Sequence, residues 1–191
     1  MLLFFNQVTS QDKEAEIFFK DGTSLHGFGM IYKNNKIKFK LFLDDEPDIW
    51  THLMVKGIVF YDYNHGGMYE YVVLKPGGSP QLLEVLSEGE VTLYANVLSI
   101  NYYEHVDLDI NVNDHGFNTF PVSIKKKKYT TVDLYVKRES EKYPTVLNGR
   151  FRNTSQKYFS DCKEVLEKLQ TGEFRKTNAN ELVDYYNDFC F

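Results

Sequence analysis

Residues 36–43 read Lys-Ile-Lys-Phe-Lys-Leu-Phe-Leu, and apolar residues alternate with lysines along most of this stretch. Ile37, Phe39, Leu41 and Leu43 occupy every second position, and lysines stand between the first three of them. Successive side chains of a β-strand point to opposite faces, so this period of two predicts a strand with one apolar face and one charged face.

The same alternation recurs from Glu14 to about Leu147. Further runs lie near residues 14–20, 23–32, 54–61, 69–74, 82–87, 90–98, 105–112 and 131–137. Turn-forming residues separate the runs at Asp21-Gly22, Lys33–Asn35, Asn64–Gly67 and Pro76–Pro80. Short connections favour antiparallel neighbours, because a parallel crossover needs a dozen or more residues. The pattern therefore predicts an antiparallel sandwich or barrel of about nine strands over residues 11–150.

From Asn153 onward the apolar residues follow helical spacing instead. The first stripe consists of Tyr158, Phe159, Cys162, Val165, Leu166 and Leu169. Asn153 with Gln156 predicts a helix start, and Gly172 predicts its end. A second helix is predicted after Asn178, with Leu182, Val183, Tyr186, Phe189 and Cys190 on one face. The expected fold class is therefore α+β, mainly β, with a C-terminal pair of α-helices over residues 151–191 packed on the β domain.

Composition excludes two broad classes of protein. The 191 residues carry 22 basic and 27 acidic side chains, a net charge of −5, which argues against a nucleic-acid partner. No stretch approaches the roughly 18 consecutive apolar residues of a transmembrane helix. The aromatic content of 16% favours strands.

The segment Met1–Ser10 admits two interpretations. Its apolar run, Leu2 to Phe5, fits a short first strand. Val8-Thr9-Ser10 also has the small-residue spacing of a signal-peptide cleavage site, and the chain becomes polar at Asp12. We favour the second interpretation, in which residues 1–10 are the remnant of a signal peptide.

Cys162 and Cys190 are the two cysteines, and each lies on the apolar stripe of its own predicted helix. They are either two unrelated buried thiols or one disulfide that joins the helices. We favour a structural disulfide, on the condition that the protein is exported to an oxidising compartment.

No residue stands out as catalytic, cofactor-binding or metal-binding, and no cofactor is expected. The histidines, His26, His52, His65, His105 and His115, form no ligand motif. His65 and Asp62 belong to a predicted hairpin turn, and no Gly-x-Ser-x-Gly segment marks a nucleophile. A calcium loop from Asp107 would need Gly at 112 and Glu at 118, where the chain has Val112 and Asn118, so the run with Asp109 and Asn111 is predicted to be a strand.

Several short segments resemble a loose group of uncharacterised exported proteins of Bacteroidota-type bacteria. The segments that carry the resemblance are Asp21-Gly22 with Gly27, Val55–Ile58, Gly89–Tyr94, Tyr135–Arg138, Phe159–Cys162 and Tyr186–Cys190. The resemblance implies an N-terminal signal, a β-rich body and a cysteine-bearing helical tail. It implies no activity and no catalytic residues.

The expected function is that of a non-catalytic binding or structural module in the periplasm, the outer envelope or the medium, with a protein or envelope component as partner. Two alternatives stand beside it. One is a hydrolase whose site is assembled from dispersed His, Asp and Ser residues. The other is a cytoplasmic interaction protein with both thiols reduced.

Overall fold

The computed structural model describes residues 12–33, 35–61, 67–108, 111–112, 118–119 and 122–190, and covers only the backbone at 97–131. The chain forms two compact units, one made of Met1–Asn96 with Leu134–Phe191 and the other of Val97–Asp133.

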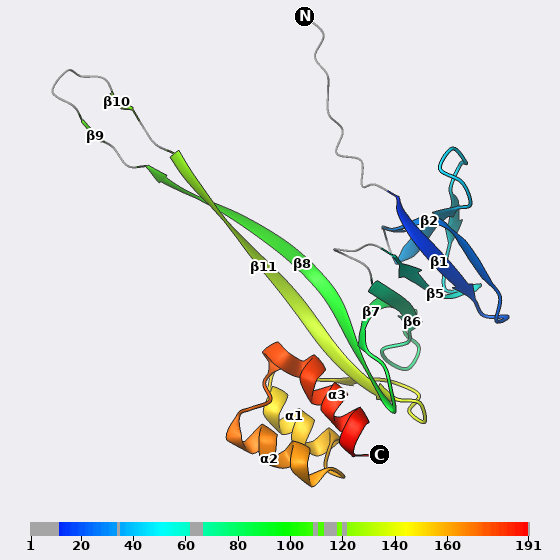
Figure 1. Ribbon diagram of the computed structural model, residues 1–191, viewed down its shortest axis with the longest axis vertical. Coiled ribbons are helices and arrows are strands. Elements are labelled where there is room, and N and C mark those ends of the chain that lie inside the picture. Colours follow the sequence, from blue (N-terminus) through cyan, green and yellow to red (C-terminus); the bar gives the residue numbers. More distant parts are fainter. Residues whose placement is uncertain are drawn as a thin grey trace, which may run out of the picture. The chain divides into compact units, whose positions relative to one another are not determined.

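Ten strands form one sheet in the order β12-β11-β8-β7-β6-β5-β1-β2-β3-β4 (Figure 1). The strands are β1 Lys13–Phe19, β2 Ser24–Tyr32, β3 Lys36–Lys40, β4 Asp48–Trp50, β5 Val55–Phe60, β6 Gly67–Val72, β7 Gln81–Ser87, β8 Val91–Leu108, β11 Val122–Arg138 and β12 Thr145–Val146. The mainly-β class with C-terminal helices is confirmed. Among the described residues the outer strands β12 and β4 do not pair with each other, so the sheet is open, as in a sandwich, and not a closed barrel.

Residues at alternating positions of the first strands form the hydrophobic core on one side of the sheet. The buried residues of this core are Ala15, Ile17, Ile37, Phe39, Val55, Ile58, Phe60 and Leu82. Gly29 in β2 leaves room for this packing, because a Cβ there would lie 2.9 Å from Cδ1 of Ile58, two strands away in the sheet.

The prediction for residues 41–43 was wrong, since β3 ends at Lys40. Leu41 and Leu43 are 46% and 60% exposed. The N–H of Phe42 donates to Asp45 Oδ2 at 2.9 Å, and the N–H of Asp45 donates to the Phe42 carbonyl. These bonds form a turn that takes the chain out of the strand ladder, which apolar periodicity alone does not reveal.

The predicted runs at 90–98 and 105–112 mostly belong to one 18-residue strand, β8. Its neighbour β11 is nearly as long, at 17 residues. The second unit contains parts of both strands and the two-stranded sheet of β9 (Asn111–Val112) and β10 (Asn118–Thr119).

The first predicted helix is divided in two, α1 (Phe151–Tyr158) and α2 (Lys163–Thr171). Cys162 precedes α2 in an extended conformation, which interrupts the helix. The predicted start at Asn153 was wrong, because α1 is capped by Arg150 and Asn153 lies within its first turn. Gly172 does end α2, in the left-handed conformation with φ of 79°.

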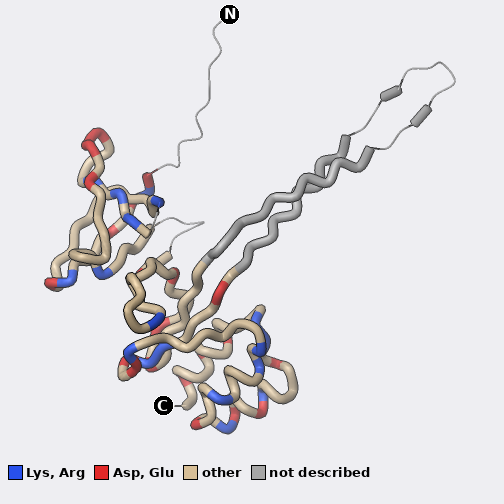
Figure 2. The backbone as a smooth tube through the Cα atoms, turned by 180° about the vertical axis from the view of Figure 1, so that it is seen from behind, with Lys and Arg blue, Asp and Glu red and all other residues tan. Residues whose placement is uncertain are grey.

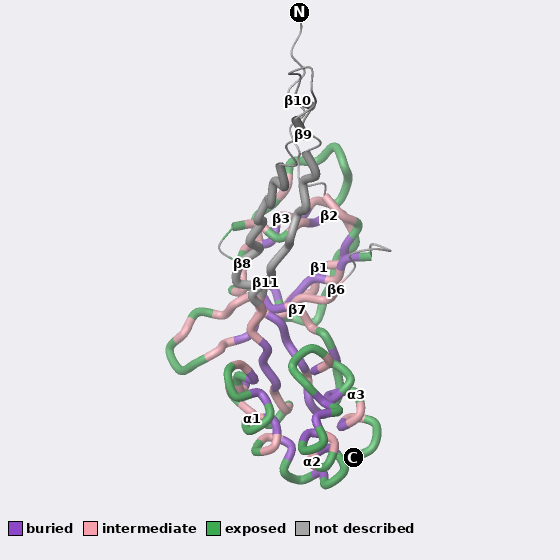
Figure 3. Tube along the Cα trace, turned by 90° about the vertical axis from the view of Figure 1, so that its left-hand side faces the viewer, coloured by how far each residue is buried: buried purple, intermediate pink, exposed green. Residues whose placement is uncertain are grey.

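The last helix, α3 (Ala179–Phe189), follows a single 3₁₀ turn at Lys176–Asn178, and Asn178 occupies its N-cap position, as predicted, although its Oδ1 accepts from the N–H of Arg175 and not from α3. The buried residues of this helix are Ala179, Leu182, Val183 and Tyr186. In α2 the buried residues are Val165 and Leu169, whereas Leu166 is only half-buried. Each helix thus has one buried and one exposed face (Figure 3). No described helix has both the length and the apolar character that crossing a bilayer requires.

Two polar residues of α3, one helical turn apart, form hydrogen bonds with the end of β7 and the start of β8. Asp184 Oδ1 accepts a hydrogen bond of 2.5 Å from the Ser87 hydroxyl. Asn187 accepts from the N–H of Val91 and donates to the Val91 carbonyl, both at 2.9 Å, as a neighbouring strand would. A Cβ on Gly89 would overlap the Asn187 amide, so a glycine is needed at this approach.

We expect Asn187→Asp to lower the free energy of unfolding by about 2 kcal/mol or more, because the lost amide donor leaves a carboxylate facing backbone carbonyls. Asn180→Asp is the matched control. Asn180 is exposed in the first turn of α3, where a negative charge is tolerated or favoured, so its effect should stay within about 0.5 kcal/mol. Urea unfolding followed by circular dichroism compares the two, and equal stabilities would contradict the role given to Asn187.

Candidate functional site

A disulfide joins Cys162 to Cys190, with the two Cα atoms 5.7 Å apart. Cys162 immediately precedes α2 and Cys190 immediately follows α3, so the bond ties the start of one helix to the end of the other. No free cysteine occurs in the chain.

The end of β11 meets the helices at Arg138, whose side chain is largely buried. Its Nη2 lies within hydrogen-bond distance of three oxygens: the Tyr158 carbonyl at 3.2 Å, Asp161 Oδ2 at 3.1 Å and the Tyr186 hydroxyl at 2.9 Å. The guanidinium also lies over the Tyr158 ring, 4.5 Å from its centroid. One side chain thus contacts α1, the α1–α2 turn and α3.

Glu141 accepts two further hydrogen bonds in this cluster, and the Tyr186 hydroxyl donates a third to Asp161 Oδ2 at 2.7 Å. Glu141 Oε2 accepts from the Tyr158 hydroxyl at 2.7 Å and from the backbone N–H of Arg138 at 2.9 Å. Burial, together with the hydrogen bond to Glu141, raises the pKa of Tyr158 far above its usual 10.0. The Tyr158 hydroxyl therefore remains protonated in the folded protein and acts as a donor to Glu141.

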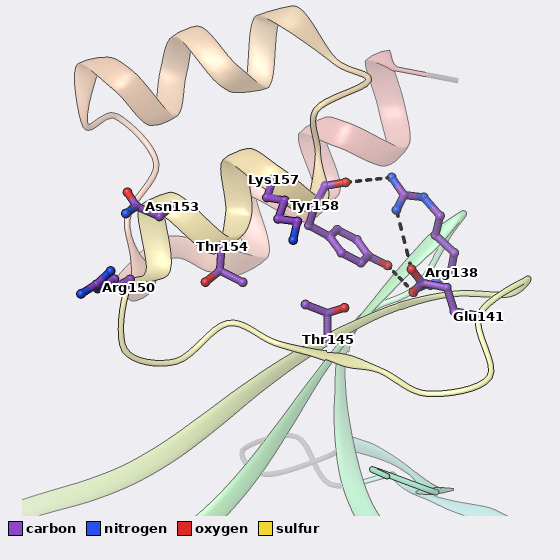
Figure 4. Close-up of a pocket in the computed structure, with 8 residues that line it drawn as sticks. All are labelled: Arg138, Glu141, Thr145, Arg150, Asn153, Thr154, Lys157 and Tyr158. Atoms are coloured by element: carbon purple, nitrogen blue, oxygen red, sulfur yellow. Dashed lines mark hydrogen bonds and ion pairs between the residues drawn. The ribbon is translucent and has the colours of Figure 1, made fainter. Parts of the chain in front are cut away.

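Beside this cluster is a pocket of about 620 Å³, which we call the helix–hairpin pocket (Figure 4). It is lined by Arg138, Glu141, Thr145, Arg150, Asn153, Thr154, Lys157 and Tyr158. Four of these residues belong to α1, and Thr145 of β12 lies on the opposite wall. Figure 4 shows the Lys157 side chain extending from α1 toward Thr145, with Arg150 at the other end of the pocket.

Positive charge predominates in the helix–hairpin pocket. Its lining contains three basic side chains and one carboxylate, and that carboxylate already interacts with Arg138 and Tyr158. Within the described part of the chain, Lys157 and Arg150 have no side-chain hydrogen bond or ion pair. Figure 2 shows acidic and basic residues intermixed over the helices as a whole, so the excess is a property of the pocket and not of this end of the protein.

A second cavity, of about 490 Å³, lies next to the β6–β7 turn. Its lining consists of Asn35, Leu74, Lys75, Gly78, Ser79, Pro80, Gln81, Tyr135 and Val146. Lys75 is the one charged residue among them, so this cavity offers fewer groups that could orient a ligand.

The histidines that sequence analysis considered do not converge where the structure describes them. His26 is exposed, 3.5 Å from Glu16, and His52 packs edge-on against Tyr71. The side chains of His65, His105 and His115, and of Asp62, Asp107, Asp109 and Asn111, lie outside the description. Within the described residues, no three His, Cys, Asp or Glu side chains form a group that could hold a metal ion.

None of the residues that line the helix–hairpin pocket was predicted from the sequence to belong to a site. One signal was available: residues 151–158 contain no acidic residue, so the positive charges at Arg150 and Lys157 cannot be paired within that helix. These two residues are seven positions apart, which places them on the same face. The contribution of Arg138 and Thr145 depends on how the β11–β12 hairpin folds back toward α1.

We expect Tyr158→Phe to lower stability at pH 7 by about 1 kcal/mol, because Glu141 loses one donor. The deficit should shrink above pH 10. Since the pKa of Tyr158 is raised in the folded state, the native protein retains a proton that the unfolded chain releases, and wild-type stability falls as pH rises.

Urea unfolding at pH 7 and pH 10.5 measures both effects. Tyr143→Phe is the control at pH 7, because within the described residues the Tyr143 hydroxyl makes no hydrogen bond, and its effect should stay within about 0.5 kcal/mol. A Tyr158→Phe deficit that is constant or larger at pH 10.5 would contradict the assigned contact.

No protein-family model matches this chain, and no curated protein or solved structure is similar to it.

Proposed function

We propose that this protein is a non-catalytic binding module that acts in the periplasm, at the outer envelope or in the medium, and that its ligand site is the helix–hairpin pocket. The observation that carries the proposal is the pocket itself. Its volume lies within the range of small-molecule sites, and polar side chains reach it from both the hairpin and α1.

The kinds of residue in the lining favour binding over hydrolysis. None of the eight residues is a histidine, cysteine or serine. The single carboxylate, Glu141, accepts two hydrogen bonds from the protein, so it is poorly placed to take a proton from a substrate or a water. The threonines have no base beside them to activate a hydroxyl. What remains is a set of donors and charges suited to holding a ligand in one orientation.

The disulfide supports the choice of compartment. Disulfides persist in oxidising environments and are rare in the cytosol. Cys162 and Cys190 lie at helix ends packed into the fold, and Cys162 is only 3% exposed, which fits a structural bond.

The binding proposal is tested by titrating the ¹⁵N-labelled protein with a small-molecule library that spans neutral, anionic and cationic compounds. We expect chemical-shift changes that cluster at residues 138–158. Thr154→Trp should abolish them by filling the pocket, whereas Gln170→Trp, at an exposed position of α2, should not. Shifts that cluster around residues 74–81 instead, or turnover of a bound compound, would refute this assignment.

The compartment is tested by thiol alkylation and intact-mass measurement of protein taken from its native cells. We expect no alkylation before reduction and two alkylated cysteines after it. Two alkylated cysteines in the absence of reductant would contradict the export proposal and favour a cytoplasmic protein.

A further inference from the structure

We propose that the ligand of the helix–hairpin pocket is an organic oxyanion, a molecule that carries a carboxylate or a phosphate ester on an uncharged body, and that Lys157 supplies the principal charge contact. This inference rests on the proposed function, because it names the class of ligand for the same site.

The first argument is the balance of charge. Arg138 has its charge met by Glu141 and Asp161, at 3.9 and 3.1 Å. Lys157 and Arg150 line the same pocket and have no such partner in the described part of the chain. The whole chain has a net charge of −5, so the positive charge of this pocket is opposite in sign to the net charge of the protein. A ligand with a negative group would complete the pairing.

The second argument is the kind of neutral group around Lys157. Thr154 lies one turn away on α1, and Thr145 lies on the facing wall in β12 (Figure 4). Threonine hydroxyls can donate to the oxygens of a carboxylate or a phosphate. The pocket thus combines one flexible ammonium group with donors on both sides of it, an arrangement suited to a group with several acceptor oxygens.

The third argument concerns the body of the ligand. A pocket of about 620 Å³ is far larger than a bare inorganic anion. The Tyr158 ring forms part of its lining, and the hydroxyl of that ring is already used by Glu141, so Tyr158 offers aromatic surface and not a free polar group. Aromatic surface favours the apolar face of a ring or chain attached to the anion.

The wall of the pocket that contains Tyr158 is held rigidly by hydrogen bonds. Tyr158 is held by Glu141 at its hydroxyl, by Arg138 over its ring and by Arg138 at its carbonyl. A wall that is fixed before binding loses little conformational freedom when the ligand arrives. The exposed side chains of Lys157 and Arg150 still have to become ordered when the ligand binds.

The test compares four probes by calorimetry and by ¹⁵N chemical-shift mapping: glucose, glucuronate, glucose 6-phosphate and inorganic phosphate. Glucose and glucuronate differ by one carboxylate, so the pair isolates the charge. We expect glucuronate or glucose 6-phosphate to bind at residues 138–158 at least tenfold more tightly than glucose and inorganic phosphate. If only glucuronate binds, the ligand is a carboxylate. If only glucose 6-phosphate binds, the ligand is a phosphate ester.

Lys157→Gln should weaken the preferred anion about tenfold or more, since a hydrogen bond with a charged partner is lost. Lys163→Gln is the matched control. Lys163 lies on α2, outside the pocket lining, with its side chain 84% exposed and 3.8 Å from Glu167, so its loss should leave affinity unchanged.

The outcomes separate this inference from the proposed function. Glucose that maps to the pocket as tightly as either anion, with no effect of Lys157→Gln, would overturn the oxyanion assignment and leave the pocket as the ligand site. Inorganic phosphate that binds as tightly as the ester would overturn the requirement for an organic body. Anions that map outside residues 138–158 would overturn both proposals.

Discussion

The C-terminal part of this protein depends on one partly buried positive charge, the guanidinium of Arg138. Its Nη2 contacts the end of α1, the turn before α2 and the Tyr186 hydroxyl of α3. Withdrawing a guanidinium from water is unfavourable unless oxygens replace its hydration, and the helices supply these oxygens. Asp161 and the Tyr158 carbonyl do so only if the first predicted helix ends near Phe159. The interruption between α1 and α2 therefore fits the needs of this charge.

The disulfide acts on the same region as Arg138. Asp161 is the residue before Cys162, and the N–H of Cys190 donates to the Tyr186 carbonyl. The covalent bond thus restrains the two segments that supply oxygens to the guanidinium. Asn187 adds a third restraint by pairing with the backbone of Val91, one turn after Asp184 contacts Ser87. Arg138 links the hairpin to the end of α1, the disulfide links α2 to α3, and Asn187 and Asp184 link α3 to the ends of β7 and β8; the helix–hairpin pocket lies between α1 and the hairpin.

The polar chemistry of the pocket follows from the same arrangement. Arg138 engages Glu141 and Asp161, and Glu141 also fixes Tyr158. Those acids are then occupied, while Lys157 lies in a helix that contains no acidic residue and Arg150 lies immediately before that helix. The paired charges around Arg138 thus lie beside the positive charges of Lys157 and Arg150, which are unpaired within the residues that the structure describes. This separation of roles is the physical basis for assigning binding, and not proton transfer, to the site.

Local periodicity in the chain was enough to predict most strands and several helix boundaries. Alternating residues such as Ile37 and Phe39 specify strands, Gly172 and Asn178 mark helix boundaries, and these signals act over a few residues. Where a local turn competes, as at Leu41 and Leu43, periodicity overextends the strand. Three features became apparent only in the folded protein: the sheet stays open, the first helix breaks before Cys162, and Thr145 faces Lys157. Those outcomes depend on contacts such as Arg138 with Tyr186, 48 positions apart in sequence, and a distant partner leaves no trace in a window of neighbouring residues.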